Sequence, residues 1–102
     1  MDKVFKALAD PTRRRILQLL REREMTAGEI AGRFELSKPT MSGHFAVLRE
    51  ADLVASERAG TSITYRLNVS VLEEALAGFA DLLSIGGPRA GVARKKGRLR
   101  DA

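Results

Sequence analysis

Hydroxyl and basic side chains gather in the segment that begins at Ser37, and together they could bind a polyanion. Lys38 can reach a phosphate or a guanine, while Thr40 and Ser42 can donate to or accept from phosphates and base edges. The same residue types also suit an ordinary solvent-exposed helix start. The pattern therefore becomes informative only through the elements around it, and with those elements we predict that Lys38, Thr40 and Ser42 contact DNA.

Two neighbours complete this candidate surface with weaker signals. Gly43 has no side chain with which to contact a base, and it lowers helix stability by about 1 kcal/mol relative to Ala. His44 falls at the edge of the apolar face of the expected helix, where partial burial and a phosphate contact are equally good interpretations. Both residues are included in the predicted DNA-binding surface.

Arginines elsewhere in the chain could add phosphate contacts. We predict such contacts for Arg15, Arg58 and Arg66, each of which could equally be a solvated surface charge. Arg13 differs because it lies one helical turn before Ile16, on the inner face of its helix. An internal ion pair is the expected role of Arg13.

Several kinds of chemistry lack the side chains that they need. The 102 residues include no cysteine and one histidine, which removes disulfides, thiolate nucleophiles and the usual transition-metal ligand sets. Glu73 and Glu74 are consecutive on a predicted helix and point about 100° apart, so with Asp81 they indicate a solvated face. Nor is there a glycine-rich phosphate loop. We predict no metal site, no cofactor and no enzymatic activity.

Length and charge place these candidates in one small domain. We expect a folded domain over residues 1–86 and a basic, disordered tail over 87–102. Residues 88–102 hold six basic side chains and one acidic, which accounts for the whole net charge of +5. The body is formally neutral, so a basic surface there requires charge segregation. Without a long apolar run or a signal-peptide segment, we expect a cytoplasmic protein that does not insert into membranes.

Capping signals divide the body into four helices before a pair of strands. Asp10 and Pro11 separate two helices, Thr26 and Glu29 form a capping box for the third, and Ser37 caps the fourth. Their apolar positions recur at helical spacing. The expected helices cover Val4 to Leu8, residues 11–23, a short stretch carrying Ile30, Ala31 and Phe34, and residues 38 to about 51.

The second half predicts a β-hairpin and a long final helix. Residues 53–57 and 62–67 alternate as strands around a basic turn at 58–61. The final helix, over 70–84, is apolar over nearly half its circumference, which exceeds what one core requires. We therefore predict a homodimer interface formed by the first and last helices, through Val4, Phe5, Leu8, Leu72, Leu76, Phe79 and Leu83.

The order of these elements is typical of a winged helix-turn-helix, a mainly α fold with a small β-hairpin. In such a domain the second helix of the motif enters the major groove of double-stranded DNA, and the hairpin reaches along the backbone or into the minor groove. The alternative is an interaction module in which the same helix and hairpin grip a protein. A specific site with a steep salt dependence would distinguish DNA binding from that alternative.

The motifs also resemble a known family over about residues 3–84. The phrases ADPTRRRIL at 9–17, LSKPTMSGHF at 36–45, VLREADLV at 47–54 and YRL at 65–67 are similar to those of the ArsR/SmtB repressors, most of all the SdpR-like autorepressor branch. The resemblance implies four helices, a hairpin and a fifth helix, with dimerisation through the first and last helices. It also implies that the helix beginning near Ser37 binds an inverted-repeat operator.

The resemblance further implies transcriptional repression, including that of the chain's own promoter. Because the sequence shows no recognisable ligand set, release could depend on an unidentified protein partner, a small-molecule inducer or simple concentration. Two residues depart from the family pattern. Gly43 stands where a larger polar residue is common, and Phe45 stands where Leu is usual.

Overall fold

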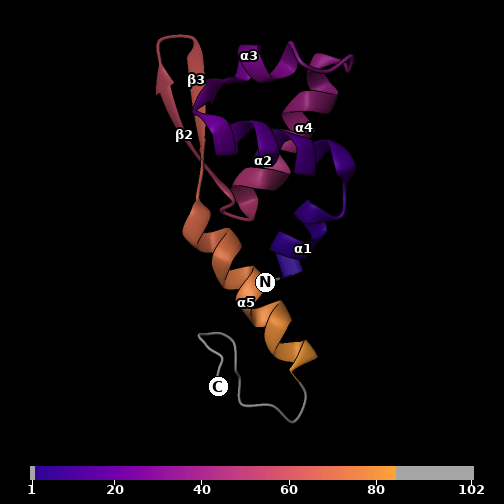
Figure 1. Ribbon diagram of the computed structural model, residues 1–102. Helices are drawn as coiled ribbons and strands as arrows, with labels where there is room; N and C mark the ends of the chain where they lie inside the picture. Colours follow the sequence, from indigo (N-terminus) through magenta and orange to yellow (C-terminus); the bar gives the residue numbers. More distant parts are fainter. Residues whose placement is uncertain (1, 85–102) are drawn as a thin grey trace. The chain divides into compact units, whose positions relative to one another are not determined.

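The computed structural model describes residues 2–84, so the predicted tail at 87–102 lies outside the described residues (Figure 1). Residues 2–69 form one compact unit, and residues 70–84 belong to a second, so α5 (Val69–Leu83) is described by itself. The first unit contains α1 (Asp2–Leu8), α2 (Pro11–Glu22), β1 (Met25–Thr26), α3 (Ala27–Ala31), α4 (Lys38–Glu50), β2 (Val54–Ala59) and β3 (Ser62–Leu67). No helix in the described part of the chain is long and apolar enough to cross a membrane.

The junction between α1 and α2 is held by side chains at the start of α2. The Asp10 carboxylate accepts hydrogen bonds from the backbone N–H groups of Thr12, at 2.8 Å, and Arg13, at 3.2 Å, which caps α2 as predicted. The Arg14 guanidinium donates to the carbonyl of Leu8 at 2.7 Å. Arginine thus satisfies a carbonyl at the end of α1 that has no partner within a helix of 7 residues.

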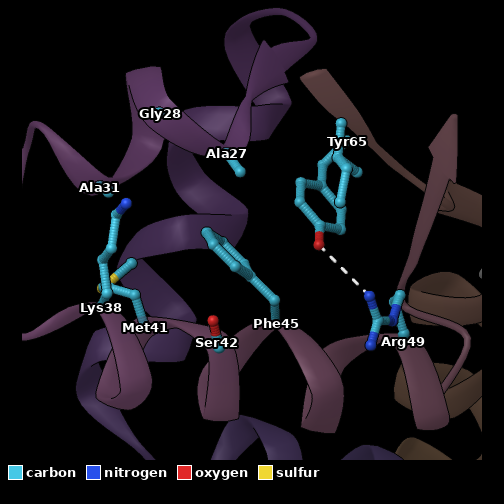
Figure 2. Close-up of a pocket in the computed structure, with 10 residues that line it drawn as sticks. Ala27, Gly28, Ala31, Lys38, Met41, Ser42, Phe45, Arg49 and Tyr65 are labelled. Carbon is cyan, nitrogen blue, oxygen red and sulfur yellow. Dashed lines mark hydrogen bonds between the residues drawn. The ribbon is translucent and has the colours of Figure 1, made fainter. Parts of the chain in front are cut away.

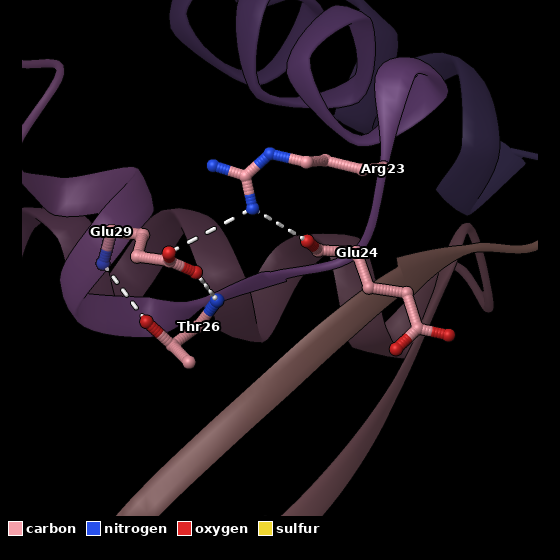
Figure 3. Close-up of polar contacts among 4 residues, drawn as sticks. All are labelled: Arg23, Glu24, Thr26 and Glu29. Carbon is pink, nitrogen blue, oxygen red and sulfur yellow. Dashed lines mark hydrogen bonds and ion pairs between the residues drawn. The ribbon is translucent and has the colours of Figure 1, made fainter.

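The predicted capping box opens α3 (Figure 3). The backbone N–H of Thr26 donates to the Glu29 carboxylate at 2.8 Å, and the N–H of Glu29 donates to the Thr26 hydroxyl at 3.1 Å. Arg23 adds an ion pair to Glu29 at 3.7 Å. The Thr26 hydrogen bond and the Arg23 charge together hold the pKa of Glu29 below its ordinary value of 4.5.

A short strand ahead of α3 makes the sheet larger than the predicted hairpin. β1 pairs antiparallel with β3, with Met25 opposite Tyr65, so the order in the sheet is β1-β3-β2. Sequence analysis missed this strand because two residues are too few to show alternation. The pairing of β1 brings the start of α3 beside β3, which comes much later in the chain.

The hairpin turn is shorter than the sequence suggested. β2 runs to Ala59, which pairs with Ser62, so Arg58 lies in the strand and not in the turn. Gly60 has a φ of 63°, and it occupies the first position of the two-residue loop, where hairpin turns require a positive φ. Because the loop has only two residues, the strand pairing continues through Arg58, which the sequence had placed in a turn over 58–61.

The end of α4 is fixed by a reversal that uses an aspartate. The N–H of Asp52 donates to the Arg49 carbonyl at 2.9 Å, and the N–H of Leu53 donates to the Leu48 carbonyl at 3.1 Å. This is a Schellman arrangement, with Asp52 at a φ of 59° where glycine is usual. Leu53 is fully buried, so the turn also delivers an apolar side chain to the core.

Apolar residues from every element of the first unit form its core. Ile16, Ile30, Met41, Leu48 and Leu53 are the largest of the fully buried side chains. Phe45 of α4 stacks on Tyr65 of β3, with ring centroids 4.7 Å apart and an interplanar angle of 22°. An aromatic contact therefore joins α4 to β3 of the hairpin.

Candidate nucleic-acid interface

The outer face of α4 carries the predicted DNA-binding residues. Lys38, Thr40, Ser42 and Gly43 are all exposed, whereas Met41, Phe45 and Leu48 of the same helix are buried. The division follows from helical geometry, because residues three and four apart share one face. Four of the predicted residues are thus exposed on α4, with Lys38 and Ser42 on one side of the helix and Thr40 on another.

Hydroxyl groups at the start of α4 are already oriented within the chain. The Ser37 hydroxyl accepts from the N–H of Thr40 at 3.2 Å and donates to the Thr40 hydroxyl at 2.9 Å. Because Ser37 supplies the proton of the second bond, the Thr40 hydroxyl keeps its own hydrogen. That hydrogen can be donated to a phosphate or base acceptor.

His44 is half-buried and contacts Arg13 of α2. One guanidinium nitrogen of Arg13 lies 3.2 Å from Nδ1 of His44. A guanidinium can only donate, so in this contact Nδ1 is the unprotonated ring nitrogen and the hydrogen is on Nε2. His44 therefore links α4 to α2, and a contact between this residue and DNA stays a prediction.

Within the part of the chain that the structure describes, Arg13 does not form the predicted ion pair. Its Nε donates to the carbonyl of Ala7 at 2.9 Å, and a terminal nitrogen donates to the carbonyl of Lys6 at 3.0 Å. The inward direction was predicted correctly, but the partners are carbonyls at the end of α1 and a histidine. A helix end presents unpaired carbonyl oxygens, and these attract a guanidinium as a carboxylate would.

The same Arg13 also affects Asp10, the residue that caps α2. Burial acts to raise its pKa, but the N–H groups of Arg13 and Thr12, with the Arg13 charge, outweigh that effect. The pKa of Asp10 is therefore held below its ordinary value of 3.8.

The two predicted arginines of the wing lie on opposite faces of the hairpin. Arg58 pairs with Ile63, and residues directly opposite in a ladder project to the same face, which Ile63 shares with Tyr65. Arg66 alternates with Tyr65 and projects to the other face. Both arginines are exposed, but only Arg58 shares a face with the residues that approach α4. Arg15 is exposed on α2, which packs against α4.

A pocket of about 430 Å³ lies between α3, α4 and β3 of the hairpin (Figure 2). Met41, Phe45 and Tyr65 contribute the larger side chains of its lining, with Ile63 of β3 beside them. Ala27, Gly28 and Ala31 contribute a small-residue wall from α3, and Lys38, Ser42 and Arg49 contribute polar groups from α4.

Arg49 is the residue that sequence reasoning missed. It is exposed on α4, and its guanidinium donates to the Tyr65 hydroxyl at 3.4 Å and lines the pocket. The available signal was its position one turn after Phe45, which places both side chains on neighbouring parts of the helix surface. Its partner on β3 could not be identified without the fold.

Comparison with known proteins agrees with this geometry. Residues 8–57 match the family model of a helix-turn-helix domain. The chain is 43% identical over 86 residues to the transcriptional repressor SdpR of Bacillus subtilis (strain 168), covering 84% of this chain and 96% of that protein. It belongs to the ArsR family of transcriptional regulators.

Solved structures of this family have the same fold. The crystal structure of an ArsR family transcriptional regulator superposes with a TM-score of 0.79 at 26% identity, covering 86% of this chain and 97% of the other. An ArsR-like transcriptional regulator from Rhodococcus sp. RHA1 gives a TM-score of 0.73 at 28% identity, covering 83% and 80%. The predicted family and the winged helix-turn-helix fold are confirmed. The chain is a DNA-binding transcriptional regulator of the ArsR type, with α3 and α4 as its helix-turn-helix.

Proposed function

We propose that this chain represses transcription as a homodimer that occupies an inverted-repeat operator in the cytoplasm. The observation that carries the proposal is the exposure of Lys38, Thr40 and Ser42 at the start of α4, a helix whose apolar face packs into the core. Two such helices related by a twofold axis would address half-sites about 34–36 Å apart, or one turn of DNA.

Different parts of the surface have different roles in this proposal. Ser42 and Thr40 carry base information through their hydroxyl groups, whereas Lys38, Arg15 and Arg58 neutralise phosphates. The helix surface is open at Gly43, because a Cβ atom at this position would meet no atom of the chain within 4 Å. In the proposal, DNA approaches the helix closely at this residue. His44 would contact a DNA phosphate through its Nε2–H, the ring group that Arg13 does not contact.

Dimerisation is proposed through α5 together with α1. Along α5, Leu76 is 53% exposed, Phe79 48% and Leu83 75%, which is unusual for large apolar side chains in one helix. Leu72 in α5, and Phe5 and Leu8 in α1, are half-buried. Val4 is only 7% exposed within the chain, so little of its side chain is available to a partner.

The first experiment selects bound DNA from a random pool and measures affinity for the selected sequence and for a scrambled one. We expect an imperfect inverted repeat, and Ser42→Ala should lower the ratio of the two affinities by about fivefold, the value of one hydrogen bond. Ser70→Ala is the matched control, because Ser70 is an exposed serine of α5 and is not among the residues assigned to DNA contact. Recovery of no preferred sequence, with binding insensitive to salt, would instead support the protein-binding module.

A second variant separates sequence-independent affinity from recognition. Residues 88–102 carry six basic side chains, and removing them should weaken binding to both DNAs equally. The salt dependence should flatten by about 0.9 in logarithmic slope for each lost phosphate contact. A deletion that removed discrimination and left non-specific affinity unchanged would contradict this division of roles.

The proposed repressor uses no metal or other cofactor. The motivation is the absence of cysteine and the single histidine in the sequence. Operator affinity measured with a chelator, and then with one equivalent of zinc, should be the same. A metal-specific loss of binding would overturn this part of the proposal.

A further inference from the structure

We propose that the pocket between α3, α4 and β3 binds a small aromatic carboxylate, and that the bound molecule competes with DNA. The second half of this proposal rests on the proposed function, because it requires the exposed face of α4 to contact an operator. The first half depends only on the size, lining and charge of the pocket.

The size and lining suit a flat, partly apolar molecule. A volume of about 430 Å³ lies within the range of roughly 300–1,000 Å³ usual for small-molecule sites. The stacked rings of Phe45 and Tyr65 form one side, and the methyl group of Ala27 projects toward the space between these rings in Figure 2. Aromatic side chains favour another ring in an offset or edge-to-face contact.

The charge of the lining selects an anion. Lys38 and Arg49 stand on opposite sides of the rings in Figure 2, and the Ser42 hydroxyl lies between them. The lining residues include two cationic side chains and no carboxylate. Arg49 spends one donor on the Tyr65 hydroxyl at a long 3.4 Å, which leaves further N–H groups for a carboxylate.

A bare phosphate, such as one of the DNA backbone, would use only part of this site. It would satisfy the charged and hydroxyl groups but would make no use of the apolar part of the lining, of which Ile63 is the half-buried member. An aromatic ring with one carboxylate uses both parts. Inorganic phosphate is therefore the probe that separates the two ligand chemistries.

Competition with DNA follows from shared side chains. Lys38 and Ser42 line the pocket and also belong to the exposed face of α4 that we propose for operator binding. A molecule in the pocket, with its carboxylate on Arg49, would lie against Ser42 and Lys38 and hinder their contact with DNA. Such a ligand would act as an inducer by weakening the repressor–operator complex.

The test begins with the free protein and no DNA. Amide resonances are followed by NMR during titration with 2-naphthoate, with uncharged 2-naphthamide and with inorganic phosphate. We expect saturable shifts around α3, α4 and β3 with 2-naphthoate, at a Kd of about 1 mM or tighter for a molecule of this size. The amide and phosphate should bind more weakly. Equal binding of phosphate, or shifts confined to other surfaces, would overturn the pocket assignment.

Variants locate the ligand and its charge partner. Ala27→Leu should fill the pocket and weaken 2-naphthoate binding by tenfold or more, whereas Ala59→Leu, on the exposed end of β2, should not. Ala31→Leu serves the same purpose if thermal melting shows that Ala27→Leu is unfolded. Arg49→Gln should weaken binding about threefold, the scale of an exposed ion pair, with Arg21→Gln on α2 as the control.

The final arm measures operator affinity with and without saturating 2-naphthoate. We expect a loss that is absent in Ala27→Leu. If the protein binds no DNA, the proposed function fails while the titration still decides the pocket. If 2-naphthoate occupies the pocket and operator affinity is unchanged, competition is refuted.

Discussion

Replacing Arg13 by methionine tests whether one side chain joins three helices. The guanidinium donates to the carbonyls of Ala7 and Lys6 at the end of α1 and contacts Nδ1 of His44 on α4. Methionine preserves an unbranched apolar stem and helix propensity but has no donor. The change therefore removes the hydrogen bonds while leaving most of the packing.

The magnitude follows from those contacts. Two of the three lie in partly buried surroundings and the bond to Lys6 is exposed. At a net value near 1 kcal/mol for each partly buried bond and less for the exposed one, the loss is about 2 kcal/mol. That corresponds to a decrease of roughly 10 °C in Tm for a domain of this size.

The assay is chemical denaturation at neutral pH followed by circular dichroism, with Arg15→Met as the matched control. Arg15 is an exposed arginine of the same helix, so its loss removes the same charge and should change stability by less than about 0.5 kcal/mol. His44→Ala and the double variant complete a cycle, for which we expect a coupling of about 0.5–1.5 kcal/mol with Arg13.

Two results would refute this reasoning. If Arg13→Met and Arg15→Met destabilise the protein equally, the carbonyl contacts contribute nothing beyond a surface charge. If the cycle gives no coupling, the contact between Arg13 and His44 does not tie α2 to α4. Hydrogen exchange of α1 amides gives an independent check, since the uncapped helix end should open more often.

Other changes test single features of the fold and interface. Asp10→Ala should cost about 1 kcal/mol at pH 7 by removing a helix cap, with Asp10→Asn as the tolerated control. Because folding lowers the pKa of Asp10, its stabilisation is fully present above 3.8 and is lost as pH falls through the lower folded pKa. The difference in unfolding free energy between parent and variant should therefore shrink as pH falls below 3.8. Asp52→Gly should raise the free energy of unfolding by about 0.5 kcal/mol, since glycine adopts its positive φ without strain; a lower Tm would contradict the Schellman assignment. Leu76→Asp should convert the proposed dimer to monomer in sedimentation and weaken operator binding with it, and a dimer of unchanged affinity would exclude Leu76 from the interface.

Features encoded within one turn of chain were predictable from the sequence. The caps at Asp10, Thr26 and Ser37 each bond to a residue at most three positions later, so residue types alone place the helix starts. The same locality explains the exposed and buried faces of α4, because helical periodicity follows from backbone geometry. The family phrases lie in these segments, and for that reason the fold and its general function were also within reach.

Features that join distant segments were decided by the tertiary structure. The two-residue strand β1 has no pattern of its own and exists because β3 offers an edge to pair with. Arg13 meets His44 across 31 positions of sequence, and charge alone favoured a carboxylate over the carbonyls and imidazole that it contacts.

The pocket has the same origin. Arg49 and Tyr65 come from a helix and a strand whose approach depends on the Schellman turn at Asp52 and the hairpin register. The sequence by itself determined which residues α4 exposes, because that depends on local backbone geometry. Only the folded chain decided which of those residues share a cavity with the wing, because such contacts arise when separate elements pack together.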